Sequence, residues 1–423
     1  MRRHDPVLVV GGGIGGMALA LSLDDAGFTD VRIFESGSSS SELGVGINVL
    51  PHAVRELTEL GLLSALEGSA VATAELAYHS THGIRIWGEP RGRAAGYRWP
   101  QLSIHRGALL RTLADAVLDR LGADAVSFSH RFTGLAQTAD RVTASFVEPG
   151  SGAALPDVEG AVLVGCDGVH SVVRGLLVAD EGPPLWNGIT MWRGVTRAPT
   201  MLTGATMIMA GHFARRMVVY PIEPAVDGDQ LINWVAEHKG DEARPMPPQD
   251  WSHEVDREAV LEVFGDFDFD FYDLTSLVHR ADAVYQYPMV DREPLTTWRN
   301  GLATLLGDAA HPMYPVGSNG ASQAILDARH LARALATESD TGDALDRYEA
   351  ERLPPTAAIV RANRQVGPER CMEIVHERAP DGFDRVEDVI SQRELEEISA
   401  AYRKTAGFAV EELNQRTSLS VEA

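Results

Sequence analysis

The sequence predicts an α/β protein: a Rossmann-like nucleotide-binding domain split around an inserted, mainly antiparallel β domain, with a helical segment at the C-terminal end. Three observations predict this arrangement. A buried-strand pattern, a glycine-rich turn and a helical pattern begin the chain in that order, and buried-strand patterns with acidic residues at their ends return twice. Between those two later patterns, the sequence alternates like antiparallel strands joined by turns.

The first strand is expected over residues 7–10, which form a continuous, mostly β-branched apolar run typical of a strand buried on both faces. Gly11, Gly13 and Gly16 follow in the order G-x-G-x-x-G, and residues 17–26 have helical periodicity. In such a unit the glycine backbone can approach a pyrophosphate, whose charge is stabilised by the N-terminus of the helix. These residues therefore predict a dinucleotide site.

A second strand over residues 31–34 ends at Glu35, 19 residues after Gly16, where an acceptor for ribose hydroxyls is expected. The motif does not distinguish NAD from FAD. Helical patterns follow over residues 51–66 and 106–121.

Two later strand patterns are followed by an aspartate. One, over residues 161–165, leads to Asp167 and Gly168, and the other, over residues 302–306, leads to Asp308. The carboxyl ends of strands in an open α/β sheet are where ligands bind, and a carboxylate suits a polyhydroxyl chain. For Asp167 and Gly168 alone, a simple turn is an equally good interpretation.

The inserted β domain is predicted from four alternating segments, residues 188–196, 206–210, 217–222 and 231–237. A helix is expected over residues 321–336, and its N-terminus would present a positive field to an anionic ring. We expect the nucleotide-binding domain to comprise residues 1–75, 101–180 and 285–367, the second domain residues 76–100 and 181–284, and the C-terminal helical segment residues 368–423.

Composition excludes several classes of function. The chain has 37 Lys and Arg against 60 Asp and Glu, a net charge of −23, so it lacks the basic surface of a nucleic-acid binder. Lys239 and Lys404 are the only lysines, which leaves no Walker lysine or polybasic membrane patch. Cys166 and Cys371 are too few for a disulfide framework or a Cys-ligated zinc site. No apolar stretch is long enough to span a membrane, and we expect a cytoplasmic protein without a metal site.

The three motif regions together resemble FAD-dependent aromatic hydroxylases of the para-hydroxybenzoate hydroxylase type, and most closely the phenazine-carboxylate hydroxylases. The resemblance extends to about residue 365, and the phrases that carry it are residues 43–48, 103–107, 188–196, 286–292 and 319–327. It implies a glutathione-reductase-type FAD domain. It also implies reduction of FAD by NADH or NADPH, reaction with dioxygen to a flavin C4a-hydroperoxide, and hydroxylation of a small aromatic substrate by a monomer or homodimer.

The resemblance also implies roles for individual residues. FAD-binding roles fall on the glycine turns, strand ends and helix starts, namely Gly11, Gly13, Gly16, Glu35, Arg106, Asp167, Gly168, Asp308, Gly320 and Ala321. The Asp167–Gly168 pair would also meet the transient nicotinamide. The backbone of Pro315 and Gly317 would lie near flavin C4a.

Substrate contacts are harder to predict. Four aromatic residues could form the pocket but could equally belong to the core, Trp192, Tyr220, Trp234 and Tyr314. Arg193 and Arg216 could each bind a substrate carboxylate, although a structurally paired arginine is the commoner case. His311 could act as a base, but a structural histidine is the safer interpretation.

Three alternatives remain open at this point. The flavin could support another oxidation, such as oxidative decarboxylation, epoxidation or dehydrogenation, or the protein could bind flavin without turnover. A nicotinamide dehydrogenase would explain the first 35 residues but not Gly307 and Asp308.

Overall fold

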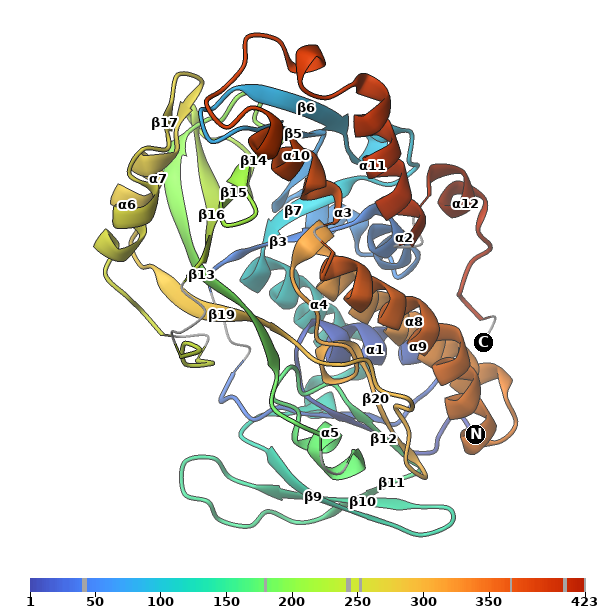
Figure 1. Cartoon of the computed structure of the whole chain (residues 1–423). Helices are drawn as coiled ribbons and strands as arrows, with labels where there is room; N and C mark the ends of the chain where they lie inside the picture. The colour runs from blue at the N-terminus through green and yellow to red at the C-terminus, as the bar shows by residue number, and fades with distance from the viewer. Residues whose placement is uncertain are drawn as a thin grey trace.

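A five-stranded parallel sheet forms the centre of the nucleotide-binding domain, as predicted (Figure 1). The computed structural model describes residues 1–39, 44–178, 181–240, 245–250, 253–365, 367–405 and 409–421. In spatial order the strands of the sheet are β20 (Ala303–Leu305), β12 (Val162–Gly165), β1 (Val7–Val10), β2 (Val31–Phe34) and β8 (Val126–Ser127). The three predicted buried strands are therefore adjacent, and their carboxyl ends meet at one edge of the sheet.

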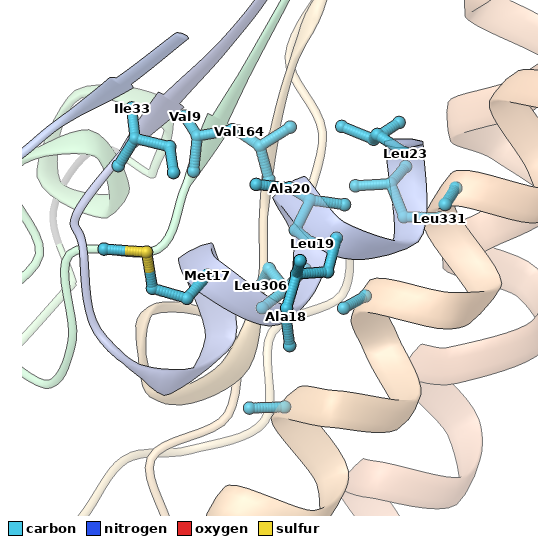
Figure 2. Packing of buried hydrophobic residues seen from close by; sticks show 14 of the residues in the cluster. Val9, Met17, Ala18, Leu19, Ala20, Leu23, Ile33, Val164, Leu306 and Leu331 are labelled. Atoms are coloured by element: carbon cyan, nitrogen blue, oxygen red, sulfur yellow. The ribbon is translucent and has the colours of Figure 1, made fainter. Parts of the chain in front are cut away.

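The core of this domain lies where helix α1 (Ile14–Asp25) packs between the sheet and helix α8 (Gly320–Thr337). Figure 2 shows Met17 and Ala20 of α1 near Val9 and Val164 of the sheet, with Leu331 of α8 at the other end of the cluster. Because α1 is buried on nearly every side up to Leu23, its sequence from Ile14 to Leu23 is apolar apart from Ser22 rather than amphipathic. Two further helices complete the layer, α4 (Arg106–Leu121) and α9 (Thr341–Asn363).

The single helix expected over residues 51–66 is wrong, because two helices occupy this segment. They are α2 (Pro51–Glu59) and α3 (Leu63–Glu67). Gly61 lies between them with φ of +76°, a conformation that ends a helix and that glycine adopts without strain.

The inserted domain is built on a seven-stranded sheet in which β14 and β5 pair in parallel and the other neighbours are antiparallel. Its strands in spatial order are β19 (Tyr285–Asp291), β13 (Leu185–Pro199), β16 (Asp229–Lys239), β15 (Arg215–Pro221), β14 (Thr206–His212), β5 (Glu75–His79) and β6 (Arg85–Pro90). Strand β19 follows residue 284, where the inserted domain was expected to end, yet it pairs with β13 of this sheet. The second half of β19 is buried on both faces, which removes the alternation that would have marked it.

The two faces of this sheet are covered by different parts of the chain (Figure 1). Helices α6 (Glu258–Phe264) and α7 (Leu274–His279) pack on one face. The opposite face packs against Tyr314, Val316 and the C-terminal helices α10 (Arg370–Arg378) and α11 (Gln392–Thr405). Tyr314 and Val316 belong to residues 314–319, the loop before α8, which we call the flavin loop. We therefore call this second face of the sheet the flavin-loop face.

Smaller elements complete the fold. One three-stranded sheet consists of β3 (Gly46–Val49), β7 (Gln101–His105) and β4 (Ala70–Thr73). A second consists of β11 (Val158–Gly160), β10 (Val142–Val147) and β9 (Arg131–Gln137). A short hairpin consists of β17 (Asp268–Phe269) and β18 (Tyr272–Asp273). Short helical segments are α5 (Val172–Leu177), η1 (Gly92–Ala95), η2 (Ala123–Ala125), η3 (Gly307–Ala309), η4 (Val316–Ser318), η5 (Gly367–Glu369) and η6 (Val386–Asp388). Within the described ranges, no helix has both the length and the apolar character needed to cross a bilayer.

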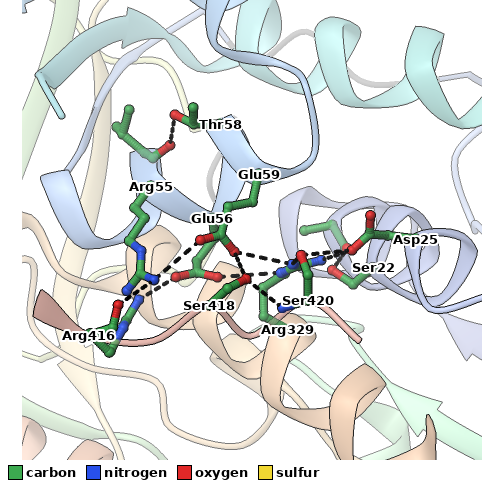
Figure 3. Close-up of polar contacts among 12 residues, drawn as sticks. Ser22, Asp25, Arg55, Glu56, Thr58, Glu59, Arg329, Arg416, Ser418 and Ser420 are labelled. Carbon is green, nitrogen blue, oxygen red and sulfur yellow. Dashed lines mark hydrogen bonds and ion pairs between the residues drawn. The ribbon is translucent and has the colours of Figure 1, made fainter. Parts of the chain in front are cut away.

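The end of the chain returns to the nucleotide-binding domain as a strap, residues 409–421, which includes α12 (Val410–Gln415). Figure 3 shows Arg416 beside the buried Glu56, and Ser420 beside Arg329. Arg329 Nη1 also forms an ion pair with Asp25 of α1 at 2.9 Å. The strap therefore ties together α1, α2 and α8, three helices that are far apart in sequence.

Candidate active site

The glycine turn between β1 and α1 is shaped by two close backbone contacts. Gly11 has φ of +107°, and a Cβ atom there would lie 2.4 Å from the carbonyl oxygen of Cys166. A Cβ atom on Gly16 would lie 2.0 Å from the carbonyl oxygen of Gly11. At Gly13, by contrast, a Cβ atom would meet nothing within 4 Å. Gly11 and Gly16 are thus required by the fold, whereas Gly13 faces open space at the N-terminus of α1, where a pyrophosphate would lie.

Glu35 is held beside this turn at the end of β2. Its Oε2 accepts a hydrogen bond from the Gly12 amide at 2.8 Å, and its Oε1 accepts one from the Gly37 amide at 2.7 Å. Two backbone donors thus fix the carboxylate next to the glycine turn, at the position expected for a ribose acceptor.

The two residues of the Asp-Gly pair have different surroundings. The carboxylate of Asp167 accepts hydrogen bonds from Ser171 Oγ at 2.5 Å and from the Val172 amide at 2.7 Å, at the start of α5. Burial raises the pKa of Asp167, and these hydrogen bonds oppose that shift. Gly168 has φ of +76° and open space around its missing Cβ atom. The structure therefore shows Asp167 supporting the loop, and Gly168 is the member of the pair that a ligand could approach.

Asp308 and Arg106 are brought together from positions 202 residues apart in the sequence. Both side chains are exposed, and the positive charge of Arg106 acts on Asp308. The residue keeps exposed surface, but the protein packed around its carboxylate reduces solvation and raises the pKa of Asp308, while His311 and Arg106 oppose that rise. Asp308 also lies next to the start of α8, since a Cβ atom on Gly320 would be 3.8 Å from Asp308 Oδ1. This grouping can hold the hydroxyl groups and phosphates of a dinucleotide.

A buried ionic network supports the Asp308 loop from below. Asp327 of α8 accepts from His311 Nε2 at 2.6 Å and from Arg352 Nε at 2.7 Å, and its Oδ2 also accepts from the Gly307 amide at 3.1 Å. Burial tends to raise the pKa of Asp327, but His311 and Arg352 hold it well below its usual range. The structure thus places His311 in a structural pair with Asp327.

Sequence reasoning missed Asp327 and Arg352 as parts of the site. The only available signal was a carboxylate in an otherwise apolar stretch of helix, and nothing in the sequence indicated which cations would face it.

The loop before α8 makes a sharp turn. Gly317 and Ser318 both have positive φ, +67° and +58°, while Pro315 is exposed just before them. Gly320 and Ala321 then begin α8, and both are partly exposed. The turn leaves the first amide groups of an 18-residue helix available to a ligand, because they have no partners within the helix.

The four predicted aromatic residues lie on opposite faces of the large sheet. Tyr220 and Tyr314 belong to the flavin-loop face, in one cluster with Val316. Trp192 and Trp234 pack on the other face against α6 and α7. Their indole nitrogens are bonded there to Gln286 at 2.8 Å and to Thr196 at 3.2 Å, respectively. The structure therefore does not bring the two tryptophans to the candidate site.

The two arginines considered for a substrate carboxylate also differ. Arg216 forms a buried ion pair with Glu237. Arg193 donates from Nη2 to the carbonyl oxygen of Gly46 at 2.8 Å and lies beside the hydroxyl groups of Tyr220 and Tyr287. Only Arg193 of the two remains available to an anion.

The described residues contain no group of three His, Cys, Asp or Glu side chains that could hold a metal ion. A cavity of about 450 Å³ lies between η1, α11 and the strap, with Trp87, Arg91, Tyr97 and Val410 among its lining residues. None of its lining residues belongs to the glycine turn or the flavin loop, so this cavity is separate from the candidate site.

Comparisons with known proteins agree with this geometry. Residues 4–363 match the family described as FAD binding domain. The chain is 45% identical to phenazine 1,6-dicarboxylic acid hydroxylase PhzS of Lysobacter antibioticus over 362 residues, covering 85% of this chain and 89% of the relative. It is 32% identical to 3-amino-4-hydroxybenzoate 2-monooxygenase PtnB3 of Streptomyces platensis, covering 91% and 95% of the two chains.

Solved structures share the fold. Klebsiella pneumoniae HpxO complexed with FAD and uric acid matches with a TM-score of 0.71 at 22% identity, covering 97% of this chain and 95% of that one. A salicylate hydroxylase substrate complex matches with a TM-score of 0.72 at 20% identity, covering 100% and 99%. The predicted fold class and FAD as the cofactor are confirmed. The chain belongs to the FAD-binding domain family that includes the FAD-dependent aromatic hydroxylases.

Proposed function

We propose that the protein is an NADH- or NADPH-dependent FAD monooxygenase that hydroxylates a small aromatic acid. The observation that carries the proposal is the placement of Gly13, Asp308 and the start of α8 around the carboxyl edge of one parallel sheet. An elongated dinucleotide with an anionic ring at one end fits donors arranged in this way.

The residues of the chain have distinct tasks in this proposal. The open space at Gly13 and the N-terminus of α1 would accommodate the pyrophosphate, and the Glu35 carboxylate would accept from a ribose hydroxyl. Asp308 would accept from the ribityl hydroxyls, with Arg106 supplying a positive charge to the phosphates nearby. Gly168 leaves room for the nicotinamide of the reductant.

Bound FAD supplies the redox chemistry, in which it accepts electrons from the nicotinamide and activates dioxygen. The chain must stabilise negative charge on the reduced ring, and the N-terminus of α8 behind Gly320 and Ala321 is the positive field available for this task. The backbone of Pro315 and Gly317 would lie against the reacting edge of the ring. Tyr314 and Val316, packed on the large sheet, would exclude water from that edge.

The names of the relatives support an aromatic acid as the substrate class. One relative is named for phenazine 1,6-dicarboxylic acid and another for 3-amino-4-hydroxybenzoate, and both compounds carry carboxyl groups on aromatic rings. Of the four predicted aromatic contacts, Tyr220 and Tyr314 belong to the cluster on the flavin-loop face of the sheet.

The test is the mass of the product formed from NADH or NADPH, isotopically labelled dioxygen and a panel of aromatic acids. We expect purified protein to be yellow, oxidation of the reductant to be stimulated by substrate, and one labelled oxygen atom to enter the product. An oxidised product without label would indicate dehydrogenation instead, and a labelled product that has lost its carboxyl group would indicate oxidative decarboxylation. A lack of stimulation across the panel would favour a flavin-binding protein without turnover.

A further inference from the structure

We infer that Arg193 is the anchor for a carboxylate on the aromatic substrate, with the hydroxyl group of Tyr220 beside it. The inference rests on the proposed function and specifies how its substrate is recognised. It assigns a role to a residue on β13, the second strand from one edge of the large sheet and far in sequence from the glycine turn and the flavin loop.

Arg193 is a charged group without an acid to balance it. One nitrogen, Nη2, is bonded to the Gly46 carbonyl oxygen, and the Nε atom is buried without a hydrogen-bond partner. Across the described residues, no Asp or Glu side chain forms an ion pair with Arg193. Burying a guanidinium group without an anion is costly, and so is leaving its N–H group unbonded. These two deficits point to a missing anionic partner.

Other arginines that are buried or largely buried in this protein carry their own acids. The pairs are Arg91 with Glu89, Arg174 with Glu181, Arg216 with Glu237, Arg329 with Asp25, and Arg352 with Asp327. The contrast with Arg216 is informative because that residue lies on the same face of the same sheet. A general need for positive charge inside this sheet therefore does not explain Arg193.

The position of Arg193 is suitable for a substrate contact. Successive residues of a strand point to opposite faces, so Arg193 points away from the α6 and α7 face on which Trp192 packs. It shares the flavin-loop face with Met191 and Tyr287, in the cluster that also contains Tyr314 and Val316 of the flavin loop. Arg193 as a whole residue is partly exposed, although its Nε atom is buried.

The neighbours of Arg193 complete a site for an aromatic carboxylate. Burial raises the pKa of Tyr220, so its hydroxyl group remains protonated and can donate to an oxyanion. A guanidinium group and a hydroxyl group together can bind both oxygens of a carboxylate. Met191, Val218 and Val235 lie on the same face and are almost completely buried, which offers an apolar surface for the ring.

The experiment measures ligand binding to FAD-loaded protein by the change in flavin absorbance. The probes are phenazine-1-carboxylate and its neutral isostere phenazine-1-carboxamide, together with 3-hydroxybenzoate, 3-hydroxybenzamide and 1-hydroxyphenazine. We expect the wild-type protein to bind each carboxylate at least about 10-fold more tightly than its amide, since the bond to Arg193 is charge-assisted. A preference for 1-hydroxyphenazine over both carboxylates would identify a phenolate as the ligand instead and overturn the assignment.

Arg193→Gln should weaken binding of the carboxylates by about 10- to 100-fold and leave binding of the amides nearly unchanged. The matched control is Arg197→Gln, four residues further along β13, where an exposed arginine pairs with Glu223 at 2.7 Å. It should leave both affinities unchanged. Arg193→Lys retains the charge and should keep part of the preference for carboxylates, which a purely structural role would not require.

Several outcomes would overturn the inference. The inference would be overturned by the wild-type protein alone if it bound the amides as tightly as the carboxylates, or if it bound neither carboxylate. Equal losses for carboxylate and amide in Arg193→Gln would indicate a structural role, and loss of FAD from that variant would indicate a contact with the cofactor. Because ligand binding is measured without turnover, these results do not depend on whether the protein hydroxylates the ligand. Failure of the proposed function and failure of this inference can therefore be distinguished.

Discussion

The imidazole of His311 lies 2.6 Å from the carboxylate of Asp327, directly behind the loop that presents Asp308. The same carboxylate accepts from the backbone of Gly307, whose φ is +62°. Asp327 thus fixes the conformation of the residue before Asp308, and the geometry of the candidate cofactor site depends on an acid that does not itself face the cofactor.

Asp327→Asn should destabilise the protein and reduce FAD retention together. The amide would leave His311 and Arg352 without their buried anion, a change that costs about 3–5 kcal/mol. Thermal unfolding and flavin content after gel filtration measure the two effects. Glu351→Gln is the control, because Glu351 pairs with His330 in a more exposed position, and it should cost much less.

Asp308→Asn should weaken FAD binding by about 10- to 100-fold with little change in folding, because the exposed carboxylate is replaced by a weaker acceptor of almost the same shape. The measurement is a fluorescence titration of apoprotein with FAD alongside a thermal melt. Unchanged FAD affinity would contradict the role given to Asp308.

Gly13→Val should fold normally but fail to take up FAD. Gly13 has φ of −77°, which valine can adopt, and its side chain would extend into the open space assigned to the pyrophosphate. Gly16→Ala should instead destabilise the fold, because its Cβ atom would collide with the Gly11 carbonyl oxygen. A fully yellow Gly13→Val protein would show that the phosphates bind elsewhere.

The protein should lose stability as the pH falls below about 6.5, the ordinary pKa of histidine. Burial lowers the pKa of His52 to about 3, and it lowers the pKa of His79 to about 4. These groups stay neutral in the folded state, so unfolding takes up protons in this range, and stability that is fully present at higher pH declines with acidification. His52→Asn should reduce the slope by about 1.4 kcal/mol per pH unit, measured by urea unfolding, whereas exposed His4→Asn should not.

Arg416→Gln should lower the free energy of unfolding by about 1–3 kcal/mol, because the fully buried Glu56 would lose one of its charged partners. A double-mutant cycle with Glu56→Gln should show that the two residues are coupled. Arg393→Gln removes an exposed pair with Glu397 on α11 and should change stability by less than about 0.5 kcal/mol.

Local patterns predicted much of the cofactor side of the molecule. Strand β1, the glycine turn and helix α4 follow from short stretches in which periodicity, glycine spacing and chain order agree. Those signals are local, so a single sequence contains them in full. The break at Gly61 was missed because one glycine in a helical pattern does not reveal whether its φ is positive.

The substrate side was less predictable for a physical reason. Alternation along β13 separates Arg193 from Trp192, but it does not reveal which face meets the flavin loop. Likewise, Arg193 and Arg216 are equivalent in the sequence and differ only because Glu237 of the neighbouring strand lies opposite Arg216. Pairings of this kind are decided by register between distant segments.

The strap also has a consequence for the order in which parts of the protein come together. The contacts of Asp25 with Arg329, of Glu56 with Arg416 and of Asp25 with Ser420 join residues 304, 360 and 395 positions apart. Each contact closes a long stretch of chain, so it should form more slowly than a local pair such as Arg55 with Glu59. Helices α1 and α2 are therefore expected to reach their final packing late in folding.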